Sequence, residues 1–197
     1  MLKPVTEQLA AIRRRLSEAS DEGARDAARK FVPTAARVYG VRMPVLNAIA
    51  REWRAGGFEL AEALWAAGAF EERMLAAKLL GLICKQDPER ALSLVASFSG
   101  EATDWAVCDT LATQGVRGIA AKKKAELLAL AGRLIDSPDL WQRRFGLVLL
   151  TNYAKDRSLR PAVESFLERV KDDREHYVKK AVEWVRRDLS KAINTPR

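Results

Sequence analysis

The chain has 197 residues, 48% of them hydrophobic and 30% charged, which is enough apolar content for a buried core in a water-soluble protein. No apolar run approaches the roughly 20 residues that cross a bilayer, and residues 1–20 are too charged for a secretory signal. We therefore expect a cytoplasmic protein without a membrane partner. The formal net charge of +8 favours polyanionic partners, because phosphates attract Lys and Arg.

The residues that commonly bind metal ions are few. Cys84 and Cys108 lie in apolar helical stretches, so we expect both to be reduced core residues. His176, the single histidine, lies near an expected helix start and is more typical of a surface residue than of a catalyst. A closed zinc site takes four ligands, so these three residues predict no metal site.

Helix-favouring residues recur from end to end, with little β-branched alternation. Proline or capping residues mark the expected helix starts at Pro4, Ser20, Pro44, Pro88, Thr103, Ser137 and Pro161. About eleven helices are expected, over residues 4–19, 21–31, 43–55, 58–67, 70–85, 88–98, 103–113, 121–136, 138–153, 159–170 and 175–191.

The connections are short and no Ser/Gly-rich linker divides the chain, which predicts a single domain over residues 1–197. Small residues recur on comparable helices about 30 to 40 positions apart, a spacing typical of HEAT or armadillo repeats. These residues are Ala76, Ala106, Gly146 and Ala181. We therefore expect an all-α superhelix of helix pairs with a concave face; the alternative is an irregular helical bundle.

Two pairs of residues four positions apart, Trp105 with Asp109 and Lys180 with Trp184, each place an indole beside a charge on one side of a helix. At 100° per residue, Asp109 faces away from the apolar stripe of its helix and Trp105 lies at the edge. Trp105 could shield the carboxylate from water and strengthen its field. The alternative is a solvated Asp beside a half-buried Trp.

Two further helices combine apolar and basic residues. Segment 138–153 is apolar nearly all round but contains Arg143 and Arg144, so at least one of them should meet a carboxylate of the protein or a phosphate. On the last helix, Lys180 and Arg187 flank Trp184 at the margin of an apolar stripe. Interleaved rings and cations suit a sugar–phosphate backbone; alternatively, Trp184 closes the core.

Five segments in this order resemble the AlkD-like DNA alkylation repair glycosylases, a family of HEAT-like repeats. They are YGVRMPVLNAIAREW (39–53), EERMLAAKLL (71–80), DWAVCDTL (104–111), DLWQRRFGLVLL (139–150) and HYVKKAVEWVRRDLSK (176–191). The resemblance covers most of the chain.

The resemblance implies a monofunctional glycosylase that removes positively charged N3- or N7-alkylated purines from double-stranded DNA, without a metal or other cofactor. Asp109 would be the catalytic carboxylate, Trp105 and Trp184 the rings against the lesion, and Arg144 a basic group of the cleft, with Arg143 as its substitute. An upstream aromatic residue of the cleft would be Phe31 or Tyr39. We expect a monomer that binds DNA without a deep pocket for a flipped base.

One residue departs from the family pattern. Asp104 stands where relatives often have an aromatic residue or Asn, and its charge would oppose phosphate unless it caps the helix. Two alternatives remain: a non-catalytic DNA-binding repeat protein, and a helical scaffold that binds another polypeptide. A structure in which internal carboxylates use all of Arg144 would favour the scaffold.

Overall fold

The structure, a computed structural model, describes residues 3–35 and 37–194. Residues 1–2, 36 and 195–197 of the expected domain lie outside the described residues. The described residues contain no β-strand, which confirms the all-α prediction. Their α-helices are α1 (Val5–Glu18), α2 (Glu22–Phe31), α3 (Met43–Glu52), α4 (Gly57–Ala67), α5 (Phe70–Ile83), α6 (Pro88–Ser99), α7 (Trp105–Thr110), α8 (Lys124–Ile135), α9 (Leu140–Leu149), α10 (Arg160–Arg169) and α11 (His176–Asn194).

Seven of the eleven helix starts were predicted one to three residues too early, and the largest difference is at α8, which begins at Lys124 rather than at residue 121. The structure caps α2, α7 and α9 with Asp21, Asp104 and Asp139, whose side chains accept hydrogen bonds from backbone N–H groups of the first turn. An ionised carboxylate is a strong acceptor there and also faces the positive end of the helix dipole. The expected helix over 103–113 also changes character, because a π-helical turn, Leu111–Gly115, follows α7.

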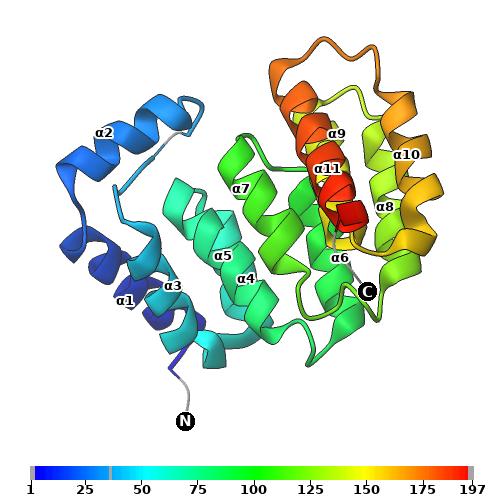
Figure 1. The fold of residues 1–197 in the computed structure, drawn as a ribbon. Helices are drawn as coiled ribbons and strands as arrows, with labels where there is room; N and C mark the ends of the chain where they lie inside the picture. Colours follow the sequence, from blue (N-terminus) through cyan, green and yellow to red (C-terminus); the bar gives the residue numbers. More distant parts are fainter. Residues whose placement is uncertain (1–2, 36, 195–197) are drawn as a thin grey trace.

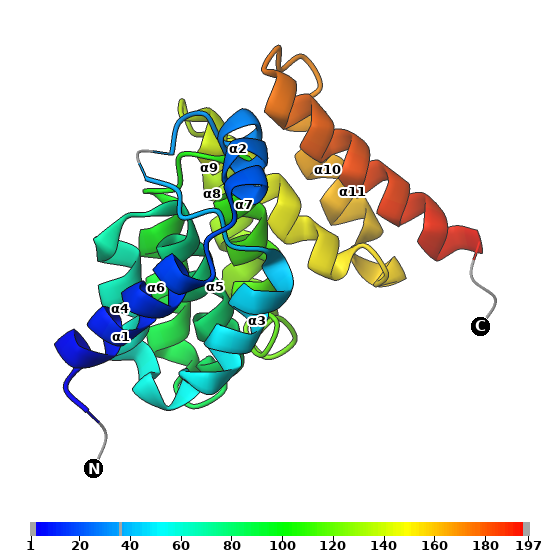
Figure 2. The ribbon, with the colours of Figure 1, turned by 90° about the vertical axis from the view of Figure 1, so that its left-hand side faces the viewer.

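The helices form two rows. Helices α3, α5, α7, α9 and α11 pack against one another in chain order, and we call them the inner row. Of the remaining helices, which we call the outer row, α1 contacts α4, α4 contacts α6, and α8 contacts α10. Figure 1 shows this progression from α1 to α11 across the molecule. In Figure 2, α1, α4 and α6 lie on one side and α3 on the other. Successive helices of the inner row can therefore contribute side chains to one surface.

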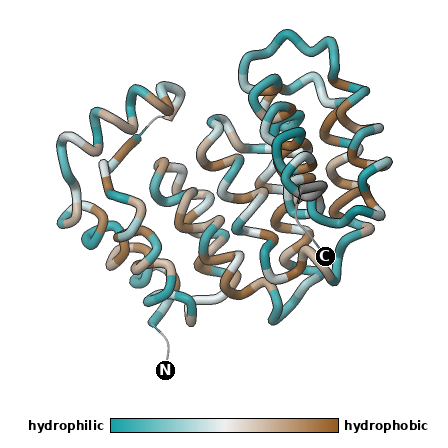
Figure 3. The backbone as a smooth tube through the Cα atoms, viewed as in Figure 1, coloured by the Kyte–Doolittle hydropathy of each residue, from teal (hydrophilic) through white to brown (hydrophobic). Residues whose placement is uncertain are grey.

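The buried apolar side chains form one connected core between the rows. Figure 3 shows hydrophobic segments along the packed helices and a hydrophilic connection between α10 and α11. Cys84 and Cys108 are both buried and unpaired, as predicted. The predicted all-round apolar character of segment 138–153 is confirmed from Phe145 to Leu150, which are all buried.

Gly146 allows α9 to approach α8 closely. A Cβ atom at this position would lie 2.9 Å from the carbonyl oxygen of Ala131. Replacing Gly146 with Ala should gain up to about 1 kcal/mol in helix propensity. The contact with a fixed backbone atom should cost about 1–3 kcal/mol, so we expect a net loss of about 1 kcal/mol in the free energy of unfolding.

Urea unfolding of the Gly146→Ala variant measures this loss. Gly23→Ala is the matched control, because an added Cβ there meets only the Asp21 side chain at 3.5 Å. The control should be at least as stable as the original protein. Equal stability of the two variants would contradict close packing at Gly146.

Two adjacent buried carboxylates hold the segment between α2 and α3. Glu71 accepts hydrogen bonds from the backbone N–H groups of residues 39, 40 and 41, at 2.7–3.1 Å. Glu72 accepts from Arg13, Arg37 and the Tyr39 hydroxyl, at 2.8–3.1 Å. These bonds supply the partners that buried carboxylates require. They also fix the chain that leads from α2 to α3.

Candidate functional site

A pocket of about 330 Å³ lies where the C-terminal end of α2 meets the N-terminal parts of α7, α9 and α11. Figure 1 shows these helix ends on the same side of the molecule. The lining contains three cations and four rings, but no carboxylate: Lys30, Phe31, Trp105, Arg144, His176, Tyr177 and Lys180. Such a lining attracts anions and offers flat surfaces for stacking.

Trp105 is held in a defined orientation at the first position of α7. Its indole N–H donates a hydrogen bond to the carbonyl oxygen of Phe31 at 2.8 Å. The preceding residue, Asp104, is buried and accepts from the backbone N–H groups of Ala106 and Val107, at 2.9 Å each. The negative charge of Asp104 is therefore used to cap the helix. Trp105 joins α2 to α7 at the pocket.

Asp109 and Arg144 form a two-point ion pair between α7 and α9. Nε of Arg144 donates to Oδ1 of Asp109 at 2.8 Å, and Nη2 donates to Oδ2 at 2.7 Å. The side chains are only 15% and 7% exposed, respectively. Asp109 was expected to face away from the apolar stripe of its helix, but it is not open to solvent there, because the guanidinium of the neighbouring helix covers it. Arg144 lines the pocket, and Asp109 lies beside it.

Arg144 retains donors beyond this ion pair. Its Nη1 donates to the carbonyl oxygen of Tyr177 at 2.6 Å, and its guanidinium lies 5.9 Å from the centre of the Tyr177 ring. A guanidinium has five N–H groups, of which three are used within the described residues. Internal carboxylates therefore do not use all of Arg144, and the condition that would favour a scaffold is not met.

Burial raises the pKa of Asp109 above its ordinary value, while the hydrogen bonds and charge of Arg144 oppose this effect. Burial likewise raises the pKa of Asp104, against the two backbone N–H groups that it accepts. A carboxylate whose charge is incompletely solvated interacts strongly with any positive charge that develops nearby. Asp109 has this property.

Arg143 lies outside the pocket lining. Its Nε donates to Asp173 at 2.7 Å, and its Nη1 donates to the carbonyl oxygens of Ser137 and Pro138. The adjacent arginines therefore have different roles: Arg143 ties the start of α9 to the connection before α11, whereas Arg144 faces α7. Both meet a carboxylate, which is the structural alternative considered for them.

The three predicted residues of α11 are only partly brought together. Lys180 lines the pocket. Trp184, one turn further along, is half-buried and packs against the core, and Arg187 is exposed. The pocket lining includes neither of the latter two. Trp184 and Arg187 instead lie further along α11, toward its C-terminal end.

Several lining residues were not assigned to the site from the sequence. Tyr177 was not singled out, although its spacing of three residues from Lys180 could have placed it on the same side. His176 was expected at the surface, where it is, but it also lines the pocket. No sequence pattern around Lys30 indicated that it belongs to the site. Of the two aromatic candidates, Phe31 lines the pocket, whereas Tyr39 bonds to Glu72.

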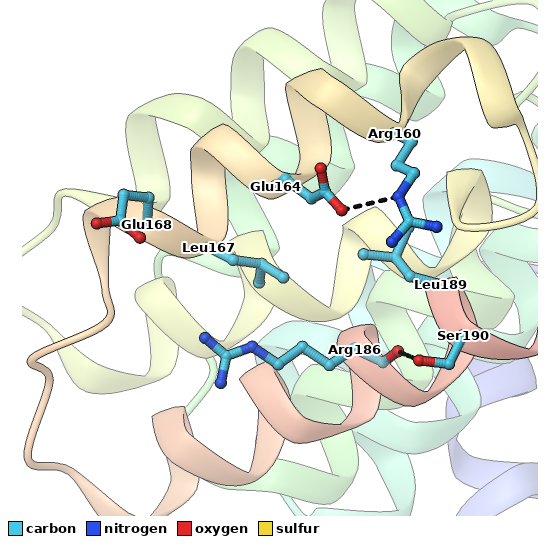
Figure 4. A pocket seen from close by; sticks show the side chains of 7 residues that line it. All are labelled: Arg160, Glu164, Leu167, Glu168, Arg186, Leu189 and Ser190. Atoms are coloured by element: carbon cyan, nitrogen blue, oxygen red, sulfur yellow. Dashed lines mark hydrogen bonds and ion pairs between the residues drawn. The ribbon is translucent and has the colours of Figure 1, made fainter.

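A second pocket, of about 370 Å³, lies between α10 and α11 (Figure 4). Its charges are balanced, and Arg160 is paired with Glu164 at 2.8 Å. Its lining is Arg160, Glu164, Leu167, Glu168, Arg186, Leu189 and Ser190. Because it has no ring and no uncompensated charge, we favour the pocket beside Asp109 as the functional site. Across residues 3–35 and 37–194, no three His, Cys, Asp or Glu side chains are grouped closely enough to hold a metal ion.

The fold and this pocket define an all-helical protein suited to a polyanionic, ring-containing ligand. A sequence model of the family described as DNA alkylation repair enzyme matches residues 12–195. The chain therefore belongs to the DNA alkylation repair enzyme family, which confirms the resemblance found from its motifs. A search of curated proteins and a search of solved structures found no match. No helix in the described part of the chain is long and apolar enough to span a bilayer.

Proposed function

We propose that this protein is a monofunctional DNA glycosylase that hydrolyses the N-glycosidic bond of positively charged N3- or N7-alkylated purines in duplex DNA. The observation that carries the proposal is the Asp109 carboxylate, held by Arg144 beside a pocket of rings and cations. Family membership supports DNA alkylation repair as the setting. The glycosylase reaction itself is our inference from the site.

The chemistry needs little besides a well-placed negative charge. A cationic alkylpurine is already a good leaving group, so the barrier comes mainly from positive charge that develops on the deoxyribose as the bond breaks. The Asp109 carboxylate would stabilise that charge and orient the attacking water. Arg144 would hold the carboxylate ionised and in place. The reaction requires no nucleophilic lysine, metal or other cofactor.

The rings would provide selectivity for a charged adduct. The faces of Trp and Tyr rings attract cations by roughly 0.5–2 kcal/mol each, which favours an alkylated base over a normal one. Trp105 and Tyr177 are at the pocket, and Trp184 would extend this surface along α11. Lys180, Lys30 and the exposed Arg187 would contact backbone phosphates.

We further propose that the two rows of helices are a HEAT-like superhelix, in one domain and acting as a monomer. Its inner row, α3 to α11, would be the concave face on which the duplex lies. The packing of consecutive inner-row helices supports this arrangement. A duplex lying along the row would meet Asp109 from the backbone side, without a deep pocket for a flipped base.

Chromatography of the bases released from methylated duplex DNA tests the activity directly. We expect N7-methylguanine and N3-methyladenine to be released and abasic sites to remain. The strand should stay intact until heat or alkali is applied, because a monofunctional enzyme forms no covalent link to the sugar. Release at the rate of buffer alone would contradict the proposal.

The raised pKa of Asp109 predicts how release depends on pH. Only the ionised carboxylate stabilises positive charge, so activity should be lost as pH falls through the pKa of the folded protein. Because burial raises this pKa, the acid limb should lie above the ordinary value of 3.8. Single-turnover rates across the acid range measure it, with circular dichroism to follow folding.

The Asp109→Asn variant is the control for this profile, since it reports the spontaneous loss of alkylpurines in acid. Rates for the original protein are taken after subtraction of the rates for this variant. A midpoint at or below 3.8 would show that burial does not govern the ionisation of Asp109.

A second function, DNA binding without base release, is favoured by one observation. Both oxygens of Asp109 accept hydrogen bonds from Arg144, which leaves the carboxylate only 15% exposed. Salt-sensitive binding of duplex DNA without release of any alkylpurine would select this function.

A further inference from the structure

Lys78 is a buried cation on α5 that has no carboxylate partner. The residue is only 6% exposed. Its ammonium donates a hydrogen bond to Oδ1 of Asn47 at 2.8 Å and another to Oε1 of Gln114 at 3.1 Å. Among residues 3–35 and 37–194, its hydrogen-bond partners are these two amide oxygens, and no carboxylate acts on its charge. Buried lysines are usually paired with an anion, because their desolvation is costly.

The backbone of the turn after α7 lies close to α5, which places Gln114 beside Lys78. Gln114 lies in the π-helical turn Leu111–Gly115, a local widening that is often found at functional positions. A Cβ atom at Gly81 of α5 would lie only 2.1 Å from the carbonyl oxygen of Gln114. Only glycine at this position permits the approach. The cluster therefore joins α3, α5 and the turn after α7.

The ammonium fixes which way the two amides face. Because it can only donate, it binds the amide oxygens, and the Nδ2 of Asn47 and the Nε2 of Gln114 face away from it. Neither nitrogen donates a hydrogen bond within the described chain, and neither is among its buried atoms that lack a partner. Four N–H donors therefore remain at a half-buried, solvent-reachable surface.

The charge around this cluster is uncompensated. Burial, and then the positive charge of the exposed Arg117, lower the pKa of Lys78, and no acidic group counters them. A donor-only surface backed by positive charge matches an anion with several acceptor oxygens. We propose that Lys78, Asn47 and Gln114 form a binding site for a phosphodiester group of the DNA backbone.

This inference rests on the proposed function only in taking duplex DNA as the ligand. Helices α3, α5, α7 and α9 are consecutive in the inner row, so the cluster belongs to the same row as Asp109 and Arg144. A duplex along this row would place a phosphate on the cluster while its lesion lies near Asp109. The cluster would contribute affinity without contacting the reacting base.

Gln114→Glu tests the site without removing the buried lysine. The new carboxylate gives Lys78 an internal partner, so the fold is kept while the site is closed to phosphate. We expect the affinity for unmodified duplex DNA to fall by about tenfold, as for the loss of a charged hydrogen bond. The slope of log K against log salt should shrink by about 0.9, the value for one phosphate.

Gln86→Glu is the matched control, with the same charge change at an exposed residue after α5. Its salt slope should equal that of the original protein. Equal affinities and slopes for Gln114→Glu and Gln86→Glu would overturn the site.

Inorganic phosphate, titrated at constant ionic strength, should compete with DNA for the original protein but not for Gln114→Glu. If phosphate instead stabilises the original protein while the DNA slope is insensitive to Gln114→Glu, the cluster binds free phosphate and the DNA assignment is wrong.

The outcomes separate this site from the proposed reaction. Binding of unmodified DNA does not require catalysis, so a reduced slope in Gln114→Glu supports the site even if base release is never observed. Conversely, normal base release with an unchanged slope overturns the site alone. Failure of the original protein to bind DNA at low salt overturns both.

Discussion

Replacing Asp109 with Asn should reduce the single-turnover rate of alkylpurine release by about 10²–10³-fold, the usual effect of removing one preorganised electrostatic group. Asn has nearly the same shape, so the pocket should persist while the negative charge that would stabilise the sugar cation is lost. Rates of N7-methylguanine release at neutral pH measure the effect. The variant should bind unmodified duplex at least as tightly, because a negative charge near phosphate has been removed.

This experiment separates catalysis from binding. If the original protein released no more alkylpurine than Asp109→Asn, the catalytic role would be lost, although DNA binding through Trp105, Lys180 and Arg144 could remain. Circular dichroism of the variant should show an unchanged helix content. A variant that binds DNA normally and releases alkylpurine about 10²–10³-fold more slowly is the expected result.

Replacing Arg144 with Met should both destabilise the protein and stop base release. The change leaves the Asp109 carboxylate buried without its partner, and breaking such a pair costs about 3–5 kcal/mol. Urea unfolding measures this loss. The double variant Asp109→Asn/Arg144→Met should recover part of the stability, because no unpaired charge remains.

Arg143→Met is the neighbouring control. It removes the ion pair with Asp173 and two backbone contacts, so it should also lower stability. It should retain base release when assayed below its unfolding transition, since Arg143 does not line the pocket. Equal loss of activity in both variants would show that Arg144 acts only through stability.

The sequence was sufficient to predict the helices, because the signals for helices are local. Apolar periodicity and capping residues lie within each helix, so the expected spans differ from α1–α11 mainly at their ends. The errors at the starts of α2, α7 and α9 came from choosing Ser or Thr over a nearby Asp. The π-helical turn after Thr110 was not predicted, and it lies against Gly81, a residue of another helix about which the local sequence contains no information.

The site was only partly predictable. Spacing within one helix predicted that Trp105 and Asp109 share one side, and the apolar segment around the two arginines of α9 singled these arginines out. The periodicity of a sequence predicts which residues share a face of one helix. It does not predict which residues of the neighbouring helix pack against that face. For this reason the shielding of Asp109 and the different roles of Arg143 and Arg144 were not predictable.

By itself, the sequence determined an all-α chain of the DNA alkylation repair family and the residues available for its chemistry. Only the tertiary structure decided which residues meet: Asp109 with Arg144, Trp105 with Phe31, and Lys78 with Asn47 and Gln114. The partners in these contacts are 31 to 74 positions apart in the chain. Contacts over such separations depend on how helices pack, and packing is a property of the whole core rather than of any one segment.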